Sequence, residues 1–237
     1  FPISFASESM EGVEMWYDAS DLNADGTTDT GYSAGSAVNS WNDKSGNGYH
    51  LTKSGDPTWA SQNGLGVVNF DGDDSFYSAN EWGGKREFTI LSIARYTHST
   101  NNFRLIADRT SNNWIFGFHS GRMHTWHFGG WLTQVDNGKD TKFHLHSASM
   151  TNTDKGNTFF DGSRVGSVNG NGATGSYMPR QIQFGGWQTN SEYSKGEVAE
   201  FIAFDRVLGG AERMAVEGYL ANKWGIAHQL PADHFNR

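Results

Sequence analysis

Short hydrophobic runs alternate with turns rich in Gly, Asn and Asp along most of the chain. Residues 114–118 and 142–146 repeat apolar positions with the period of two that is typical of half-buried β-strands. Apolar and β-branched runs predict further strands at residues 13–18, 67–70, 88–95, 181–185 and 198–204. Asp161-Gly162 can supply the positive φ angles of a tight turn, which predicts a hairpin over residues 157–165.

One segment near the C-terminus has a helical period instead. Val216, Leu220 and Trp224 fall at positions i, i+4 and i+8, so they line one side of a helix predicted over residues 211–224. Gly225 follows as a C-terminal cap residue. We find no internal repeat and no linker, so we expect one domain over residues 1–237.

Composition narrows the function classes. The 237 residues include 30 Gly, 4 Pro and no Cys, and the net charge is −8. Many glycines with few prolines favour short strands joined by tight turns. The absence of Cys excludes thiol chemistry, and no Lys/Arg cluster offers a patch for nucleic acid. No apolar run approaches the roughly 20 residues that cross a bilayer. The chain starts Phe-Pro-Ile-Ser, so we expect a module of a longer protein.

Four segments together carry a resemblance to a known family. They are Met15-Trp16-Tyr17-Asp18-Ala19-Ser20-Asp21, Trp41-Asn42-Asp43-Lys44-Ser45-Gly46-Asn47-Gly48, Val68-Asn69-Phe70-Asp71-Gly72-Asp73-Asp74 and the closing stretch from Val198-Ala199-Glu200-Phe201 through Lys223-Trp224-Gly225. The set resembles the LamG-like members of the concanavalin A-like lectin/glucanase superfamily. The segments frame the whole chain, whereas residues 97–194 match no particular subgroup.

The resemblance implies a fold, a location outside the cell and a type of ligand. The family fold is an all-β jelly roll, a sandwich of two antiparallel sheets, here with one C-terminal helix. Such domains belong to extracellular and bacterial cell-surface proteins, including adhesins and polysaccharide-active proteins. The resemblance therefore implies glycan recognition, often assisted by calcium, with neighbouring modules of the parent chain as further partners. The motifs themselves are mainly structural.

An acidic loop is the clearest candidate for a metal site. Oxygen-bearing side chains alternate in it, and Gly26 permits a sharp turn, as in the first nine positions of an EF-hand-type calcium loop. Position twelve is Tyr32 rather than Glu, so another carboxylate must complete the shell. The predicted Ca²⁺ ligands are Asp18, Asp21, Asn23, Asp25, Thr27 and Asp29. The alternative is a solvated Asp/Asn/Gly turn. The acidic residues within 71–74 are a weaker candidate for a metal site.

Glycan sites pair a flat aromatic ring with side chains that hydrogen-bond to hydroxyl groups. Residues 119–131 hold two Trp, three His and one Arg among glycines, and residues 185–193 hold a Trp beside amide and hydroxyl groups. Trp126 alternates with His124, so both share one strand face. The predicted ligand contacts are His124, Trp126, Trp131, Trp187 and Asn190.

Core packing is the alternative for each Trp. We expect it for Trp16, Trp41 and Trp224, which lie in the predicted strands, turns and helix of the framing segments. Trp131 and Trp187 each follow a Gly-Gly pair, which is more typical of an exposed loop.

Catalysis is not expected. Glycoside hydrolases need two carboxylates across one glycosidic bond, and on this fold they alternate on a strand as Glu-x-Asp-x-x-Glu. Glu197 and Glu200 lack the intervening Asp, and no Gly-x-Ser-x-Gly motif occurs. A calcium-assisted carbohydrate-binding module is therefore the first hypothesis. A protein-binding or spacer module is the second, and a glycan-cleaving enzyme with an unfamiliar site is the third.

Overall fold

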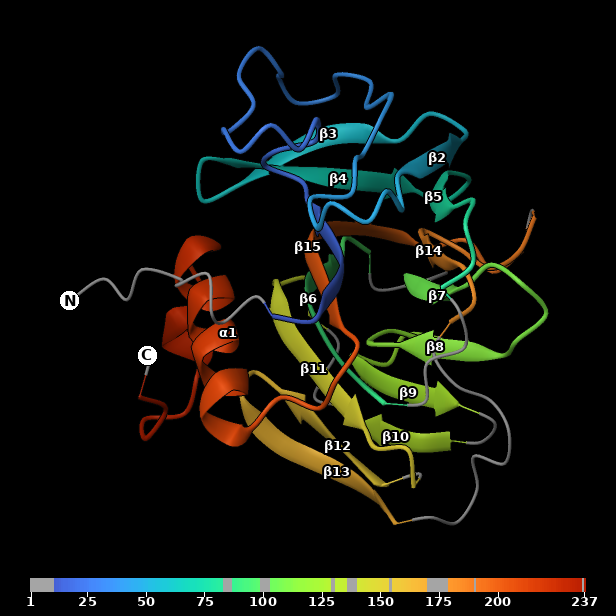
Figure 1. The fold of residues 1–237 in the computed structure, drawn as a ribbon. Helices are drawn as coiled ribbons and strands as arrows, with labels where there is room; N and C mark the ends of the chain where they lie inside the picture. The colour runs from blue at the N-terminus through green and yellow to red at the C-terminus, as the bar shows by residue number, and fades with distance from the viewer. Residues whose placement is uncertain are drawn as a thin grey trace.

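The computed structural model describes residues 11–82, 87–98, 103–128, 131–135, 140–153, 155–169, 179–189, 191–235 and 237. Two antiparallel sheets pack face to face, and an α-helix lies against the outer face of one of them (Figure 1). The fold is thus an all-β sandwich with one C-terminal α-helix, as the sequence predicts.

The sheet that contacts the helix, sheet A, joins strands from both ends of the chain. Its order is β13 (Ser163–Asn169), β12 (Lys155–Phe160), β11 (His144–Met150), β6 (Phe88–Tyr96), β15 (Lys195–Phe204), β4 (Leu65–Asp71) and β3 (Thr58–Gln62), and β1 (Val13–Asp18) also pairs with β15. β15, the last strand of the chain, pairs with β4 and β6 and also with β1, the first strand. The two ends of the chain therefore meet within sheet A.

The second sheet, sheet B, has shorter strands. Its order is β10 (Trp131–Val135), β9 (His124–Phe128), β8 (Trp114–Phe116), β7 (Ile106–Asp108), β14 (Ile182–Phe184), β5 (Ser75–Ser78) and β2 (Leu51–Ser54). The chain crosses between the sheets several times, for example from β4 in sheet A to β5 in sheet B and back to β6 in sheet A.

Aromatic side chains fill the space between the sheets. Tyr17 lies 5.7 Å from Phe184 and 6.2 Å from Phe201, measured between ring centroids, so it bridges the two sheets. Trp41 is fully buried and lies 5.3 Å from Phe184. These contacts place residues of the framing segments at the centre of the main core.

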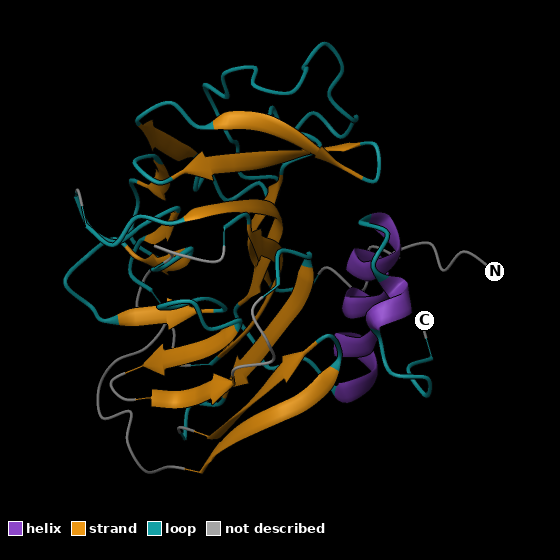
Figure 2. Cartoon of the chain, turned by 180° about the vertical axis from the view of Figure 1, so that it is seen from behind, coloured by secondary structure: helices purple, strands orange, loops and turns teal. Residues whose placement is uncertain are grey.

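A second core lies between sheet A and α1 (Gly210–Lys223), which is followed by the 3₁₀ helix η2 (Ala227–Gln229) (Figure 2). Val216, Leu220 and Trp224 are fully buried there, as the helical period predicts. Gly225 has a φ of +74°, which suits glycine at a helix C-terminus. In the described part of the chain, no helix is long and apolar enough to cross a membrane.

The predicted strands are present, but the two that were predicted as half-buried are wholly buried. Every residue of β8 and of β11 is buried, whereas the alternation of residues 114–118 and 142–146 predicted half-buried strands. The physical reason is that β11 packs against sheet B on one side and contacts α1 on the other. The predicted hairpin turn is present, with φ angles of +48° at Asp161 and +76° at Gly162.

Four charged side chains, two buried carboxylates and two half-buried lysines, link the chain ends, and we call them the Asp18–Glu200 network. The carboxylate of Asp18 lies 3.1 Å from Lys44 Nζ and 2.7 Å from Lys223 Nζ, and Lys223 also lies 2.7 Å from Glu200. Asp18 is 2% exposed and Glu200 is fully buried. Burial by itself would raise the pKa of Asp18, but the charges of Lys223 and Lys44 hold it below its ordinary value.

Two indoles complete this network. Trp16 Nε1 donates to Glu200 at 2.7 Å, and Trp224 Nε1 donates to the same carboxylate at 2.8 Å. Glu200 therefore accepts hydrogen bonds from β1 and from the end of α1 while it sits on β15. Buried carboxylates need such partners, because an unpaired buried charge is strongly destabilising.

Removal of Lys223 tests the importance of this network. Lys223→Ala leaves Glu200 buried without its cation, so we expect the free energy of unfolding to fall by about 3–5 kcal/mol. Lys53→Ala is the matched control, because Lys53 pairs at 3.5 Å with Asp56, which is 94% exposed. That change should cost less than about 1 kcal/mol. Urea unfolding followed by fluorescence measures both, and equal losses in the two variants would contradict the assignment.

Candidate ligand-binding surface

The structure separates the predicted glycan contacts into two groups. His124 and Trp126 share one face of β9, as predicted, but that face points between the sheets and both residues are fully buried. They are core residues, so their prediction as surface contacts is wrong in this structure. Trp131 is 49% exposed and Trp187 is half-buried. Asn190 lies outside the described residues.

His124 belongs to a polar pair inside the sandwich. Its Nδ1 lies 2.8 Å from Nδ1 of His146 on β11, and its Nε2 contacts the hydroxyl of Thr158 on β12. The two imidazole rings stack at 5.1 Å. Burial lowers the pKa of His124 to about 3 and lowers that of His146 well below its ordinary value. Both rings are therefore neutral near pH 7 and join the two sheets.

Trp131 lies on the outside of sheet B against two histidine rings. The ring centroid of Trp131 is 5.1 Å from that of His119 and 4.7 Å from that of His127. His127 is 9% exposed, and its Nδ1 contacts the backbone oxygen of Asn113. The two histidine rings thus pack against the indole of Trp131, and about half of the side chain stays accessible.

Trp187 joins the same region through an arginine. The guanidinium of Arg104 lies 3.8 Å from the ring centroid of Trp187, and its Nε donates to Glu192 at 2.5 Å. Glu192 Oε2 is in turn 3.8 Å from Nε2 of His119. A continuous set of contacts therefore links Trp187 to Trp131. We call this set, with the adjacent Arg122, the Trp131 surface.

Tight turns place these side chains. His119 and Arg122 are paired across Ser120-Gly121, whose φ angles of +50° and +79° make a two-residue hairpin turn. Glu192 also has a positive φ, of +47°. Non-glycine residues adopt this conformation at a cost in energy, and such residues cluster at ligand sites.

Arg104 controls the electrostatics of this surface. It is 4% exposed, and its Nη1 has no hydrogen-bond partner within the described part of the chain. Burial lowers the pKa of His119, and the charges of Arg104 and Arg122 lower it further. Burial also lowers the pKa of His127, and the charge of Arg104 lowers it further. The hydrogen bond to Asn113 raises this pKa but does not outweigh burial. Both histidines are therefore neutral near pH 7.

The acidic loop is held by groups of the protein itself. Asp21 accepts hydrogen bonds from the backbone N–H groups of Asp25 and Gly26, each at 3.0 Å. Its Oδ2 also lies 2.7 Å from Lys44 Nζ. Asp18 was predicted from the sequence as a further calcium ligand. In the structure it is paired with lysines in the Asp18–Glu200 network.

The remaining predicted calcium ligands are less constrained. Asn23 Nδ2 donates to exposed Asp25 at 3.0 Å, and Thr27 contacts the same carboxylate. Asp29 accepts from the backbone N–H of Leu22 at 2.6 Å. Burial raises the pKa of Asp29, and the nearby charges of Asp21 and Asp25 raise it further. The loop therefore gathers negative charge, and its oxygens fit calcium in kind.

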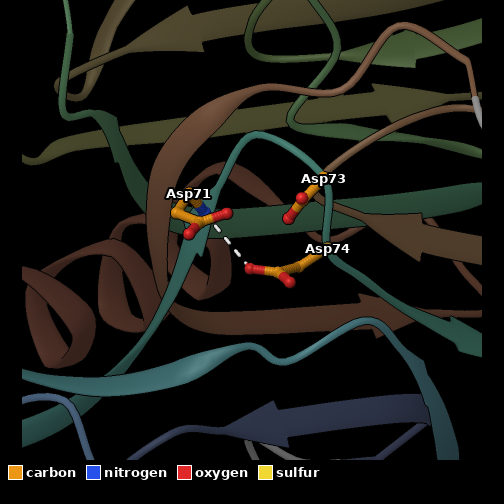
Figure 3. Close-up of side chains that lie close together, drawn as sticks. All are labelled: Asp71, Asp73 and Asp74. Carbon is orange, nitrogen blue, oxygen red and sulfur yellow. Dashed lines mark hydrogen bonds between the residues drawn. The ribbon is translucent and has the colours of Figure 1, made fainter.

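The weaker candidate is a compact acidic group at the end of β4 (Figure 3). The carboxylates of Asp71, Asp73 and Asp74 offer atoms within 4.8 Å of one another, and no other such group of three acidic or histidine residues occurs among the described residues. Asp74 accepts from the backbone of Asp56 at 2.8 Å and of Asp71 at 3.3 Å. The hydrogen bond and charge of Asp71 raise the pKa of Asp73.

Comparisons with known proteins place the fold. No protein-family model and no curated protein matches the chain. The binding domain of botulinum neurotoxin serotype D/C superposes with a TM-score of 0.62 at 13% identity, over 90% of this chain and 53% of that chain. The binding domain of Paraclostridial Mosquitocidal Protein 1 gives 0.61 at 14% identity, over 81% and 52%. The chain thus spans about half the length of these toxin domains.

A third neighbour matches over nearly its whole length. Domain 4 of AbnA, an extracellular GH43 arabinanase of Geobacillus stearothermophilus in complex with arabinotriose, gives a TM-score of 0.55 at 11% identity. The match covers 76% of this chain and 97% of that one. At these identities the likenesses show the β-sandwich fold that all these domains share.

Sequence reasoning missed Arg104 and Glu192 as parts of the Trp131 surface. They are 88 positions apart and belong to no shared motif, so no periodicity could pair them. His119 and Arg122 lie within the aromatic segment of residues 119–131, but no pattern in it distinguishes them from His124.

The buried histidine pair predicts how stability depends on pH. In the unfolded chain these histidines titrate near pH 6.5, so below that pH the unfolded state binds more protons than the folded state. Their contribution to stability is therefore complete above pH 6.5 and lost as pH falls. Each histidine accounts for a loss of about 2 kcal/mol between pH 6.5 and 5. His146→Phe should remove about half of this loss.

Urea unfolding at pH 7 and pH 5 measures the effect. His228 is exposed, so His228→Phe is the control and should retain the pH dependence of the original protein. If His146→Phe retains it as well, the pair is not the source of the acid sensitivity.

Proposed function

We propose that this chain is a carbohydrate-binding module of the lectin or adhesin type, from a secreted or cell-surface protein. The observation that carries the proposal is the Trp131 surface. Trp131 offers a half-exposed flat ring fixed against two histidines, and Glu192 and Arg104 connect it through His119 to Trp187. A flat aromatic face covers the CH side of a sugar ring, and polar neighbours bind its hydroxyl groups.

The structural neighbours support this class of ligand to different degrees. The AbnA domain is covered almost completely and is described in complex with arabinotriose. For botulinum neurotoxin type C, cell entry is described as dependent on two ganglioside molecules, and the DC binding domain has been solved with SialylT. Because the chain aligns with half of each toxin domain, the arabinanase domain is the stronger support.

A protein-binding or spacer role is the second candidate. One neighbour, the DC binding domain, is described in complex with rat synaptotagmin II, which is a protein ligand. A glycan-cleaving role is less supported by the carboxylates singled out from sequence. Glu197 pairs with Arg95 at 2.8 Å, and Glu200 is fully buried in the Asp18–Glu200 network. The LamG-like placement from sequence remains part of the proposal.

A glycan-array screen of the purified chain tests the proposal. We expect binding to a defined set of glycans, and we expect Trp131→Ala to weaken it at least about tenfold, because buried Trp contacts dominate many interfaces. Phe235→Ala is the matched control, since Phe235 is 57% exposed and is not part of the Trp131 surface. Binding that survives Trp131→Ala would place the site elsewhere. A folded protein that binds no glycan would favour the protein-binding role.

Calcium assistance is a finer part of the same proposal. When bound, the ion would supply positive charge to the acidic loop, with Asn23, Asp25, Thr27 and Asp29 as the available oxygen donors. A chelator arm in the screen tests it, and Asp25→Asn should reproduce the effect of the chelator. Asp73→Asn separates the loop from the acidic group at β4. Binding that is unchanged by the chelator would contradict calcium assistance.

A further inference from the structure

We propose that the Trp131 surface selects glycans that carry a negatively charged group, and that Arg104 and Arg122 hold this group. The inference rests on the proposed glycan-binding function and adds the chemical class of the ligand. Arg122 lies across a tight turn from His119, which contacts the exposed ring of Trp131, and Arg104 is held in an ion pair with the half-buried Glu192.

Arg104 has one donor atom, Nη1, that can bind an acceptor from a ligand. Its Nε and Nη2 atoms are occupied by Glu192, at 2.5 and 3.4 Å, and its plane rests on Trp187. The remaining arm, Nη1, is buried and has no hydrogen-bond partner among the described residues, and the same holds for Nε1 of Trp187. A buried charged donor without an acceptor is costly. A ligand that supplies an anionic oxygen forms the stronger, charge-assisted type of hydrogen bond with such a donor.

Three charged side chains act on His119. Arg104 and Arg122 act with positive charge and Glu192 with negative charge, so these three leave an excess of one positive charge. His119 and His127 add none near pH 7, because the pKa of each is lowered. This excess stands out on a chain whose net charge is −8.

Arg122 is the source of that excess. Arg104 is neutralised by Glu192, whereas no carboxylate of the described residues forms an ion pair with Arg122. The hairpin turn at Ser120-Gly121 holds Arg122 opposite His119, which contacts Trp131. A sugar stacked on Trp131 would therefore present its substituents near a guanidinium that forms no ion pair with the described carboxylates. Arginine binds carboxylate and sulfate groups through paired N–H donors.

Two pairs of glycans test the inference, because one member of each pair carries carboxylates that the other lacks. One pair is polygalacturonate and its fully methyl-esterified form, and the other is 3′-sialyllactose and lactose. We expect the wild-type chain to bind the charged member of at least one pair about tenfold more tightly, as measured by isothermal titration calorimetry. Added salt should reduce this preference.

Substitutions then assign the preference to the Trp131 surface. Arg122→Gln should abolish most of the preference without unfolding the chain, since Arg122 is partly exposed. Arg164→Gln is the matched control, because Arg164 is an exposed arginine on β13. Thermal unfolding confirms that both variants fold.

The outcomes separate the two proposals. Equal binding of charged and neutral members, or a preference that survives Arg122→Gln, would overturn the inference while glycan binding stands. Failure of the folded chain to bind any of the four probes would also overturn it. If the wider glycan array is silent as well, the proposed function fails with it.

Discussion

The rest of the structure depends on the pairing of two buried carboxylates with two half-buried lysines. Asp18 and Glu200 lie out of reach of solvent, and Lys44 and Lys223 hold them. Each charge comes from a different part of the chain: the first strand, the turn after Trp41, the last strand and the end of α1. Because a single unpaired member would be strongly destabilising, the pairing ties both chain ends to the centre of sheet A. Three of the four segments that resemble LamG-like domains meet here, which explains why those motifs are structural.

This arrangement assigns different tasks to the two sheets. The outer face of sheet A is occupied by α1, whose apolar stripe completes the second core. The Trp131 surface belongs to sheet B and to the loops beside β7, β8 and β14. Rings packed between the sheets fix the strands, and tight turns with positive φ angles then fix the side chains. A preformed surface of this kind loses little conformational entropy on binding, so a shallow site with few contacts can still bind a ligand specifically.

Sequence periodicity predicted the fold because each strand and the helix carry their own local pattern. β1, the 161–162 turn and the stripe of α1 lie where that pattern places them. The candidate site was harder to predict. Alternation showed that His124 and Trp126 share a face, but period two cannot tell which face of a strand is inside a sandwich. Arg104 and Glu192 meet through tertiary packing alone, and β11 is buried on both faces because of a helix that lies about 70 positions later.

The central claim is that a glycan docks on Trp131 and Trp187 rather than on any other aromatic group. The chain has 9 Trp residues, and each indole N–H can be followed in a ¹⁵N NMR spectrum during titration with a glycan that binds in the array. The account predicts that the signals of Trp131 and Trp187 shift with ligand, whereas those of the buried Trp41, Trp114, Trp126 and Trp224 stay in place. Shifts confined to other indoles, with Trp131 unmoved, would contradict it.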